Sequence, residues 1–212
     1  MVNTGSKTVR GFTLIELLVV LAIIMIISVV VITSQSSFNK TLILANTAYD
    51  IALTVRSAQS FGISSRNIIG AMNTGYGVHF QRGDSFIFFA DTNPPALLNC
   101  HGLPSSGDED APDAKPGNCA YDEDAGEFVN TYTLGNGMTI SNFCVDDSCD
   151  ADVTSLDIVF VRPNPDAFIS VGGSFFTDYA KTCIIVTSPQ GGEKYISVSK
   201  SGHINANAAS CP

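Results

Sequence analysis

The longest hydrophobic pattern in the chain is an almost unbroken apolar run from Phe12 to Ile32, in which Glu16 is the one charged residue. As a helix this run measures about 31 Å at roughly 1.5 Å per residue, which matches a hydrocarbon core of about 30 Å. Residues 1–11 before it carry Lys7 and Arg10 and no acid. A basic leader directly before an apolar helix predicts an exported chain that crosses the membrane once.

The pattern beyond Thr33 is polar but still helical up to about Phe61. Apolar residues recur at steps of three and four, and neither Gly nor Pro interrupts before Gly62. This spacing predicts that one long helix continues out of the membrane and packs one face on a sheet. The predicted buried stripe consists of Leu44, Ala48, Ile51, Ala52, Val55 and Ala58.

The remainder alternates short apolar runs with turn residues, which predicts antiparallel strands and an α+β fold with the long helix packed on the sheet. The Asn136–Gly137 pair is a strong hairpin signal and predicts that its two flanking strands pair with each other. The predicted strands are 76–81, 85–90, 131–134, 138–144, 156–161, 167–171, 183–187, 194–199 and 203–206.

Glu16 is the anomaly within the apolar run, because a carboxylate in hydrocarbon costs a few kcal/mol. One interpretation is that Glu16 lies near the cytoplasmic face and reaches water. The other requires a cut after Gly11, which creates an amino group on Phe12 that can pair with Glu16 of the same or a neighbouring chain.

The sequence Gly11-Phe12-Thr13-Leu14-Ile15-Glu16 resembles the signal of prepilins, the precursors of type IV pilins and type II secretion pseudopilins. The resemblance implies cleavage after Gly11, N-methylation of Phe12 by a prepilin peptidase/methylase, and a role for Glu16 in recruiting subunits to a fibre. It also implies partners in the inner-membrane assembly machinery and in other pilin subunits, contacted through the N-terminal helix. Many major pilins have a Pro where this chain has Thr33, which weakens the assignment as a major pilin.

Two further stretches resemble H-type minor pseudopilins. The first is the helix from Ala45 to Asn67 with its Val-Arg-Ser-Ala core, which also resembles T-type minor fimbrial pilins. The second is the order of strands, with Gly-Val-x-Phe at 77–80 and Tyr-Ile-x-Val-x-x-x-Gly-x-Ile at 195–204. The resemblance implies three parts: a leader at 1–11, a transmembrane helix at 12–32, and a pilin-like domain at 33–212.

The net charge excludes one class of partner. The chain has 20 acidic residues and 11 Lys and Arg, and loss of Lys7 and Arg10 with the leader lowers its net charge from −9 to −11. So acidic a surface repels phosphate backbones, and the basic residues are scattered singly. We therefore expect no binding of nucleic acid.

All six cysteines lie beyond the membrane helix, and none has Cys-x-x-Cys spacing. This usage favours disulfides in an oxidising compartment over a zinc site. Six cysteines allow fifteen pairings. We predict the nearest-neighbour set, which is Cys100–Cys119, Cys144–Cys149 and Cys183–Cys211.

The segment 91–128 is a long acidic loop with five prolines. One hypothesis is a calcium site, because calcium binds six to eight hard oxygens and tolerates irregular loops, and some relatives bind calcium in such loops. The alternative is a solvated acidic loop, favoured because the spacing does not fit an EF-hand. No cofactor other than this candidate calcium is expected. The candidate ligands are Asp91, Asn93, Asp122, Asp124 and Glu127.

The sequence gives little support to an enzyme. His79, His101 and His203 are dispersed, and no Gly-x-Ser-x-Gly or phosphate-binding loop occurs. Gly172-Gly173-Ser174 is more simply a turn, and Cys100-His101 is better explained by a disulfide. We therefore expect a protein that is not an enzyme.

Three functional hypotheses follow. The first is a minor pseudopilin or minor pilin in a type II secretion or type IV pilus fibre. The second is a major pilin of an adhesive or motile pilus, and the third is a signal-anchored binding protein that never polymerises. The first two imply an inner-membrane protein with a cytoplasmic N-terminus, a single span and an external globular domain.

Overall fold

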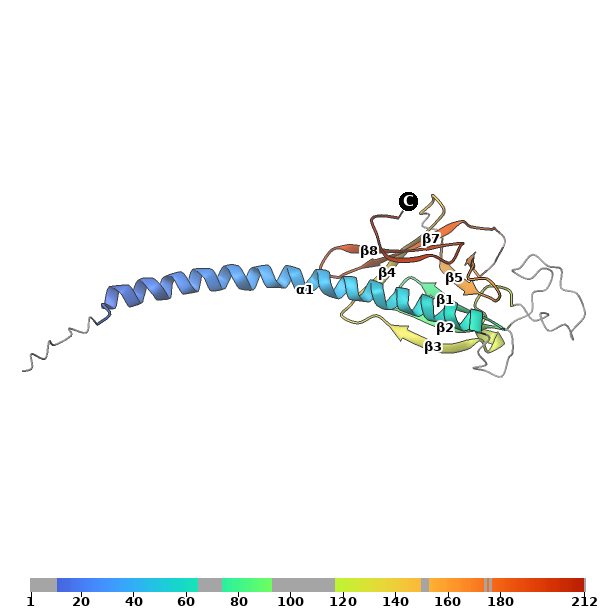
Figure 1. Cartoon of the computed structure of the whole chain (residues 1–212), viewed down its shortest axis with the longest axis horizontal. Helices are drawn as coiled ribbons and strands as arrows, with labels where there is room; N and C mark the ends of the chain where they lie inside the picture. The colour runs from blue at the N-terminus through green and yellow to red at the C-terminus, as the bar shows by residue number, and fades with distance from the viewer. Residues whose placement is uncertain are drawn as a thin grey trace, which may run out of the picture. The chain divides into compact units, whose positions relative to one another are not determined.

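The computed structural model describes residues 11–64, 74–92, 117–149, 153–173, 175 and 177–211, with the backbone alone for 33–39. Helix α1 runs from Leu14 to Ser64 and passes Thr33 without a break (Figure 1). The chain divides into two compact units, Met1–Lys40 and Thr41–Pro212. The boundary between them falls within α1, beyond the predicted end of the membrane span at Ile32.

The second half of α1 buries the stripe that its periodicity predicts. Leu44, Ala48, Ile51, Ala52, Val55 and Ala58 are all 4% exposed or less. The neighbouring Tyr49 and Leu53 are 54% exposed, so one face of the helix packs inward and the other meets solvent. The helix ends at Ser64, close to the predicted end at Phe61.

A five-stranded antiparallel sheet in the order β3-β2-β1-β5-β6 lies against this half of α1 (Figure 1). Alternate residues of its strands point to opposite faces. One face, which includes Tyr76, Val78 and Phe80, joins the core with α1. The strands are β1 (Gly75–Gln81), β2 (Ser85–Asp91), β3 (Phe128–Thr133), β5 (Ser155–Phe160) and β6 (Ala167–Val171).

A second antiparallel sheet of four strands, in the order β4-β7-β8-β9, closes the same core. Ile140, Ile184 and Ile196 contribute to it from this sheet, and each is 1% exposed or less. The α+β fold is therefore confirmed, with two sheets sharing one core with α1. The strands are β4 (Thr139–Val145), β7 (Lys181–Thr187), β8 (Glu193–Ser199) and β9 (Ile204–Ala208).

The opposite face of the five-stranded sheet carries a smaller core. Phe89, Val159 and Val161 project there and pack against Cys119, which belongs to the acidic segment 91–128. Tyr121 lies beside this cluster. The segment 117–122 therefore covers the outer face of the sheet, opposite α1.

The hairpin predicted at Asn136–Gly137 is wrong. The local turn forms, since both residues have positive φ and the Met138 N–H donates to the Gly135 carbonyl at 3.1 Å. The two flanking strands nevertheless diverge, because β3 pairs with β2 and β4 pairs with β7 in the other sheet. A turn sets the local chain reversal, but the available strand edges decide which strands pair.

The predicted loop 91–128 is shorter at both ends than expected. Asp91 is the last residue of β2, and Phe128 begins β3. Glu123–Ala125 form a short 3₁₀ helix, η1, which ends at Gly126 in the left-handed conformation. Residues 93–116 lie outside the described residues.

Candidate functional site

The residues of the N-terminal signal form a helix start. Gly11, Phe12 and Thr13 precede α1, and Glu16 lies in its first turn. The Thr13 Oγ1 accepts a hydrogen bond from the Glu16 N–H at 3.3 Å, which satisfies one of the free donors at the helix end. This role of Thr13 was not predicted above, although the Thr-x-x-Glu spacing is a known capping pattern that could have revealed it.

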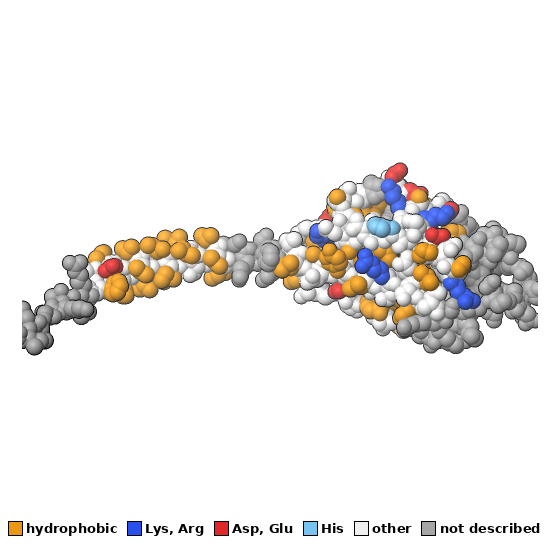
Figure 2. Space-filling model, in the orientation of Figure 1, with side chains coloured by type: hydrophobic (Ala, Val, Ile, Leu, Met, Phe, Trp, Pro, Cys, Tyr) orange, Lys and Arg blue, Asp and Glu red, His pale blue; other side chains and the backbone are white. Residues whose placement is uncertain are grey.

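The large apolar side chains in the first half of α1 are exposed. Phe12 is 82% exposed, and the large apolar side chains from Leu14 to Ile32 are between 47% and 81% exposed. Leu14–Ile32 is the one helix among the described residues that is long and apolar enough to cross a membrane. Figure 2 shows this apolar surface with a single acidic group near its beginning, which fits the position of Glu16 at the end of the span.

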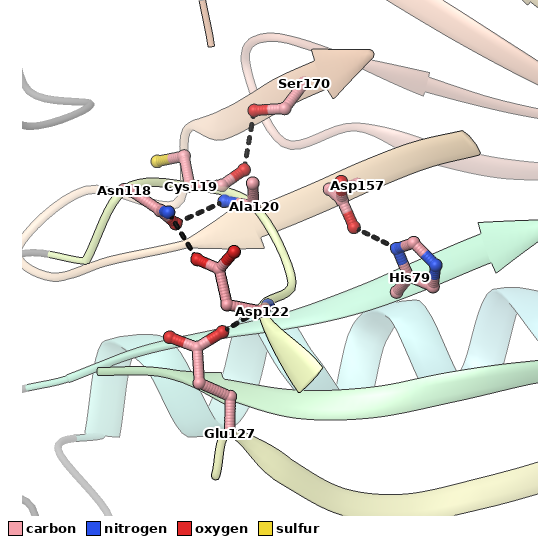
Figure 3. A network of polar contacts seen from close by, with 8 residues as sticks. All are labelled: His79, Asn118, Cys119, Ala120, Asp122, Glu127, Asp157 and Ser170. Atoms are coloured by element: carbon pink, nitrogen blue, oxygen red, sulfur yellow. Dashed lines mark hydrogen bonds and ion pairs between the residues drawn. The ribbon is translucent and has the colours of Figure 1, made fainter. Parts of the chain in front are cut away.

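A second polar site lies on the outer face of the five-stranded sheet, where the segment 117–127 crosses it. Five titratable side chains lie there, on β1, β2, β5 and the segment itself, and Figure 3 shows all of them except Asp91. We call them the outer cluster, and they are His79, Asp91, Asp122, Glu127 and Asp157.

Asp91 is fully buried at the end of β2. Its Oδ2 accepts a hydrogen bond from the Cys119 N–H at 2.9 Å. Gly117 packs so closely that a Cβ there would lie 1.6 Å from the Asp91 Oδ1. Burial, and next the nearby Glu127 carboxylate, raise the pKa of Asp91 well above its usual range, so this carboxyl favours the neutral form.

Glu127 joins both ends of the acidic loop. Its Oε1 accepts a hydrogen bond from the Thr92 N–H at 2.8 Å, and its Oε2 accepts one from the Asp122 N–H at 2.9 Å. The Asn118 amide donates in turn to the Asp122 carboxylate at 2.5 Å. These bonds fix residues on each side of the loop to one point at the sheet edge.

The structure describes four of the five predicted calcium ligands. Asp91 and Glu127 do come together, as predicted, but three of their four oxygens accept backbone N–H bonds. Asp124 is exposed on η1, and Asn93 lies outside the described residues. Within the described ranges no three His, Cys, Asp or Glu side chains are placed to hold a metal ion.

His79, Asp157 and Ser170 lie side by side on three paired strands, because His79 faces Asp157 and Asp157 faces Ser170. The His79 Nδ1 is 2.5 Å from the Asp157 Oδ1, and both residues are buried. Burial raises the pKa of Asp157, although the contact with His79 opposes the shift. The Ser170 hydroxyl donates to the Cys119 carbonyl at 2.5 Å.

This row does not have the order of a catalytic triad. In a triad the histidine lies between the acid and the nucleophile, whereas Asp157 lies between His79 and Ser170. Of the other enzyme-like features noted in the sequence, the structure describes only the two glycines. Gly172 and Gly173 form a turn with positive φ after β6. Ser174, Cys100 and His101 lie outside the described residues.

The structure contains the two predicted disulfides whose cysteines are all described. Cys144–Cys149 closes a tight turn after β4, and Cys183–Cys211 ties the C-terminal end to β7. Cys119 is disulfide-bonded as well, and its predicted partner Cys100 lies outside the described residues. No free thiol occurs among the described cysteines.

Comparison with known proteins finds one family model, the prokaryotic N-terminal methylation motif, which matches residues 6–32. No curated protein and no solved structure matches the chain. The matched residues include Gly11, Phe12 and Glu16, and they cover the capped start of α1 and its apolar exposed span. The chain therefore carries a prepilin-type N-terminal signal, which supports a type IV pilin-like or pseudopilin-like protein.

Proposed function

We propose that this chain is a minor pseudopilin or minor pilin, a structural subunit of a type II secretion or type IV pilus fibre, and not an enzyme. The observation that carries the proposal is the methylation motif at 6–32, which includes an apolar helical span whose large side chains are exposed. Such a helix needs lipid around it before assembly and apolar helices around it afterwards.

Processing would create a positive charge that can pair with the Glu16 carboxylate. Cleavage after Gly11 would create an amino group on Phe12, and the capped first turn holds Glu16 close to that end of the helix. Pairing between this amine and the Glu16 carboxylate of a neighbouring subunit would offset the cost of burying both charges in the fibre. Glu16 would then select subunits that are aligned with a small axial stagger.

The topology that fits this role has the N-terminus in the cytoplasm and the globular unit outside. The basic leader residues Lys7 and Arg10 favour a cytoplasmic N-terminus, because positive residues flank spans on that side. Disulfide-bonded cysteines beyond the span fit an oxidising compartment. The partners would be a prepilin peptidase, the inner-membrane assembly machinery and other subunits.

A minor role is favoured over a major one by Thr33. Helix α1 continues through this position without a break, where many major pilins have a Pro that kinks the helix. The amount of the chain in sheared fibres distinguishes the two roles. A minor subunit is present at a small fraction of the bulk subunit, whereas a major pilin is the bulk subunit itself.

The test of the proposal replaces Glu16 with Leu in cells that express the whole assembly system. We expect Glu16→Leu to be processed and inserted normally, because removing a carboxylate from the span favours insertion, and to be absent from sheared fibres. Glu16→Gln, which keeps the size and removes the charge, should show the same defect. Normal incorporation of Glu16→Leu would contradict the proposed role of the carboxylate.

A further inference from the structure

Strand β3 is an edge strand of the five-stranded sheet and lacks the features that usually block pairing with a further strand. It runs from Phe128 to Thr133, and within the described chain no strand pairs with its outer side. Exposed edges usually carry a charge, a Pro or a bulge that prevents further pairing. The sequence of β3, Phe-Val-Asn-Thr-Tyr-Thr, has neither charge nor Pro, and its one irregularity lies opposite Phe88 and Phe89 at its start.

A groove of about 420 Å³ runs between this edge and the flank of α1. Its wall on the helix side includes Asp50, Leu53 and Ser57, and its wall on the sheet side includes Tyr132 and Leu134. The hydroxyls of Thr47, Thr54 and Ser57 donate to the carbonyls of Ile43, Asp50 and Leu53 in their own helix. These donors are therefore satisfied, and the groove offers mainly an apolar surface.

The groove exists because α1 covers β2 but not β3. Phe86 of β2 and Tyr132 of β3 are paired neighbours on the same face, with stacked rings whose centroids are 5.4 Å apart. Phe86 is 4% exposed, whereas Tyr132 is 38% exposed. A strand added beside β3 would direct alternate side chains into this space, beneath the exposed Leu53.

The charge in the groove limits what can occupy it. Asp50 is the one charged residue in its lining, it is exposed, and it forms no ion pair within the described ranges. A second copy of this chain would add its own acidic surface, since the net charge is −9. A different polypeptide with a Lys or Arg near Asp50 is complementary to the groove.

We propose that β3 binds an extended segment of another protein as an additional strand. The backbone of that segment pairs with the free edge of β3, alternate aliphatic side chains fill the groove, and a Lys or Arg faces Asp50. This mode of recognition takes its affinity from main-chain hydrogen bonds and its specificity from alternate side chains. The inference does not depend on the proposed fibre role.

The test uses a blocked synthetic peptide of alternating Val and Thr with a single Lys, added to the full chain in detergent micelles. Two matched peptides serve as controls: one has Glu in place of Lys, and the other is N-methylated along one edge so that it cannot pair. Amide hydrogen exchange locates the bound peptide, and titration gives its dissociation constant.

We expect the Lys peptide to slow exchange in β3 and to bind about three- to fivefold more tightly than the Glu peptide. In Asp50→Asn this ratio should fall towards one, whereas Asp166→Asn, at the turn between β5 and β6, should leave it unchanged. Equal binding of the N-methylated peptide, an unchanged exchange rate in β3, or protection at another edge would overturn the proposal. Concentration-dependent protection of β3 without peptide would also overturn it, because the occupant would then be a second copy.

Discussion

Asp91 and Glu127 are two neighbouring carboxyls that are both fully buried and still compatible with a folded chain. Burying two carboxyl groups is unfavourable, and hydrogen bonds offset most of this cost. The backbone N–H groups of Thr92, Cys119 and Asp122 donate to the carboxyl oxygens of the two residues. The pKa of Asp91 is raised, so this carboxyl favours the protonated form, and a proton on Asp91 removes the charge repulsion with Glu127. A proton can therefore take the role that the calcium hypothesis gave to a cation.

The first prediction concerns pH and Asp91. Because its pKa is higher in the folded chain than in the unfolded chain, the folded state binds a proton that the unfolded state has lost. The free energy of unfolding should therefore decrease as pH rises from about 4 towards the raised pKa. Asp91→Asn should reduce this decrease, and a smaller decrease from Asp157 should remain.

Urea unfolding of the full chain in micelles, from pH 4 to 8, measures this effect. The chain has six Tyr and no Trp, so near-ultraviolet circular dichroism of the tyrosines is a suitable signal. Asp124→Asn, at an exposed position on η1, should leave the pH dependence unchanged. If Asp91→Asn has the same pH slope as the natural chain, Asp91 does not favour the neutral form.

The second prediction concerns the close packing of Gly117 against Asp91. Gly117→Ala would place a Cβ 1.6 Å from the Asp91 Oδ1, so the segment 117–122 must shift away from the sheet. We expect a loss of about 1–3 kcal/mol in the free energy of unfolding, which is typical of overpacking. Gly135→Ala is the matched control, because a Cβ there meets nothing within 4 Å. Equal stability of the two variants would show that Gly117 is not packed in this way.

At the scale of elements, one helix serves two environments. Its first half presents apolar side chains all around, which suits lipid or a bundle of helices. Its second half buries one stripe and exposes the other face. The change follows directly from the sequence, where the continuous apolar run gives way to apolar residues spaced at three and four.

The third prediction tests the buried stripe of α1. Ile51→Ala truncates a side chain that is fully buried in the core, and it should destabilise the globular unit by about 2–5 kcal/mol. Leu53→Ala truncates a side chain that is 54% exposed, and the change should stay within about 0.5 kcal/mol. Unfolding of both variants in micelles checks the difference. An equal loss of stability in the two variants would contradict the packing of the Ile51 face of α1 against the core.

The positions of the helix and strands were largely predictable from the sequence, but the pairing between strands was not. Each predicted strand occurs near its expected position, because alternation and turn residues are local signals. The pairing of β3 with β2 could not be derived from the Asn136–Gly137 turn, because that pairing depends on which sheet edges are free. The contact between His79 and Asp157 was equally hidden, since it depends on the register between two strands far apart in the sequence.

At the scale of the whole molecule, the chain combines a membrane-type helix with a disulfide-bonded globular unit. Two disulfides fix the turn after β4 and the C-terminal end, and Cys119, within the segment that covers the outer face, is disulfide-bonded as well. Cysteine usage predicts that this unit lies in an oxidising compartment outside the cytoplasm. The basic leader favours the same topology. Processing at Gly11 is the step that would convert this membrane protein into a fibre subunit.

The most direct test of the account is the N-terminus of the chain purified from its native membrane. Intact-mass measurement with sequencing of the N-terminal peptide should show a chain that begins at Phe12 and carries one methyl group on its amine. The expectation rests on the matched motif at 6–32, which spans Gly11 and Phe12, because a prepilin-type signal is expected to be cut between these two residues. A chain that begins at Met1, or at any residue beyond Ile32, would contradict the account.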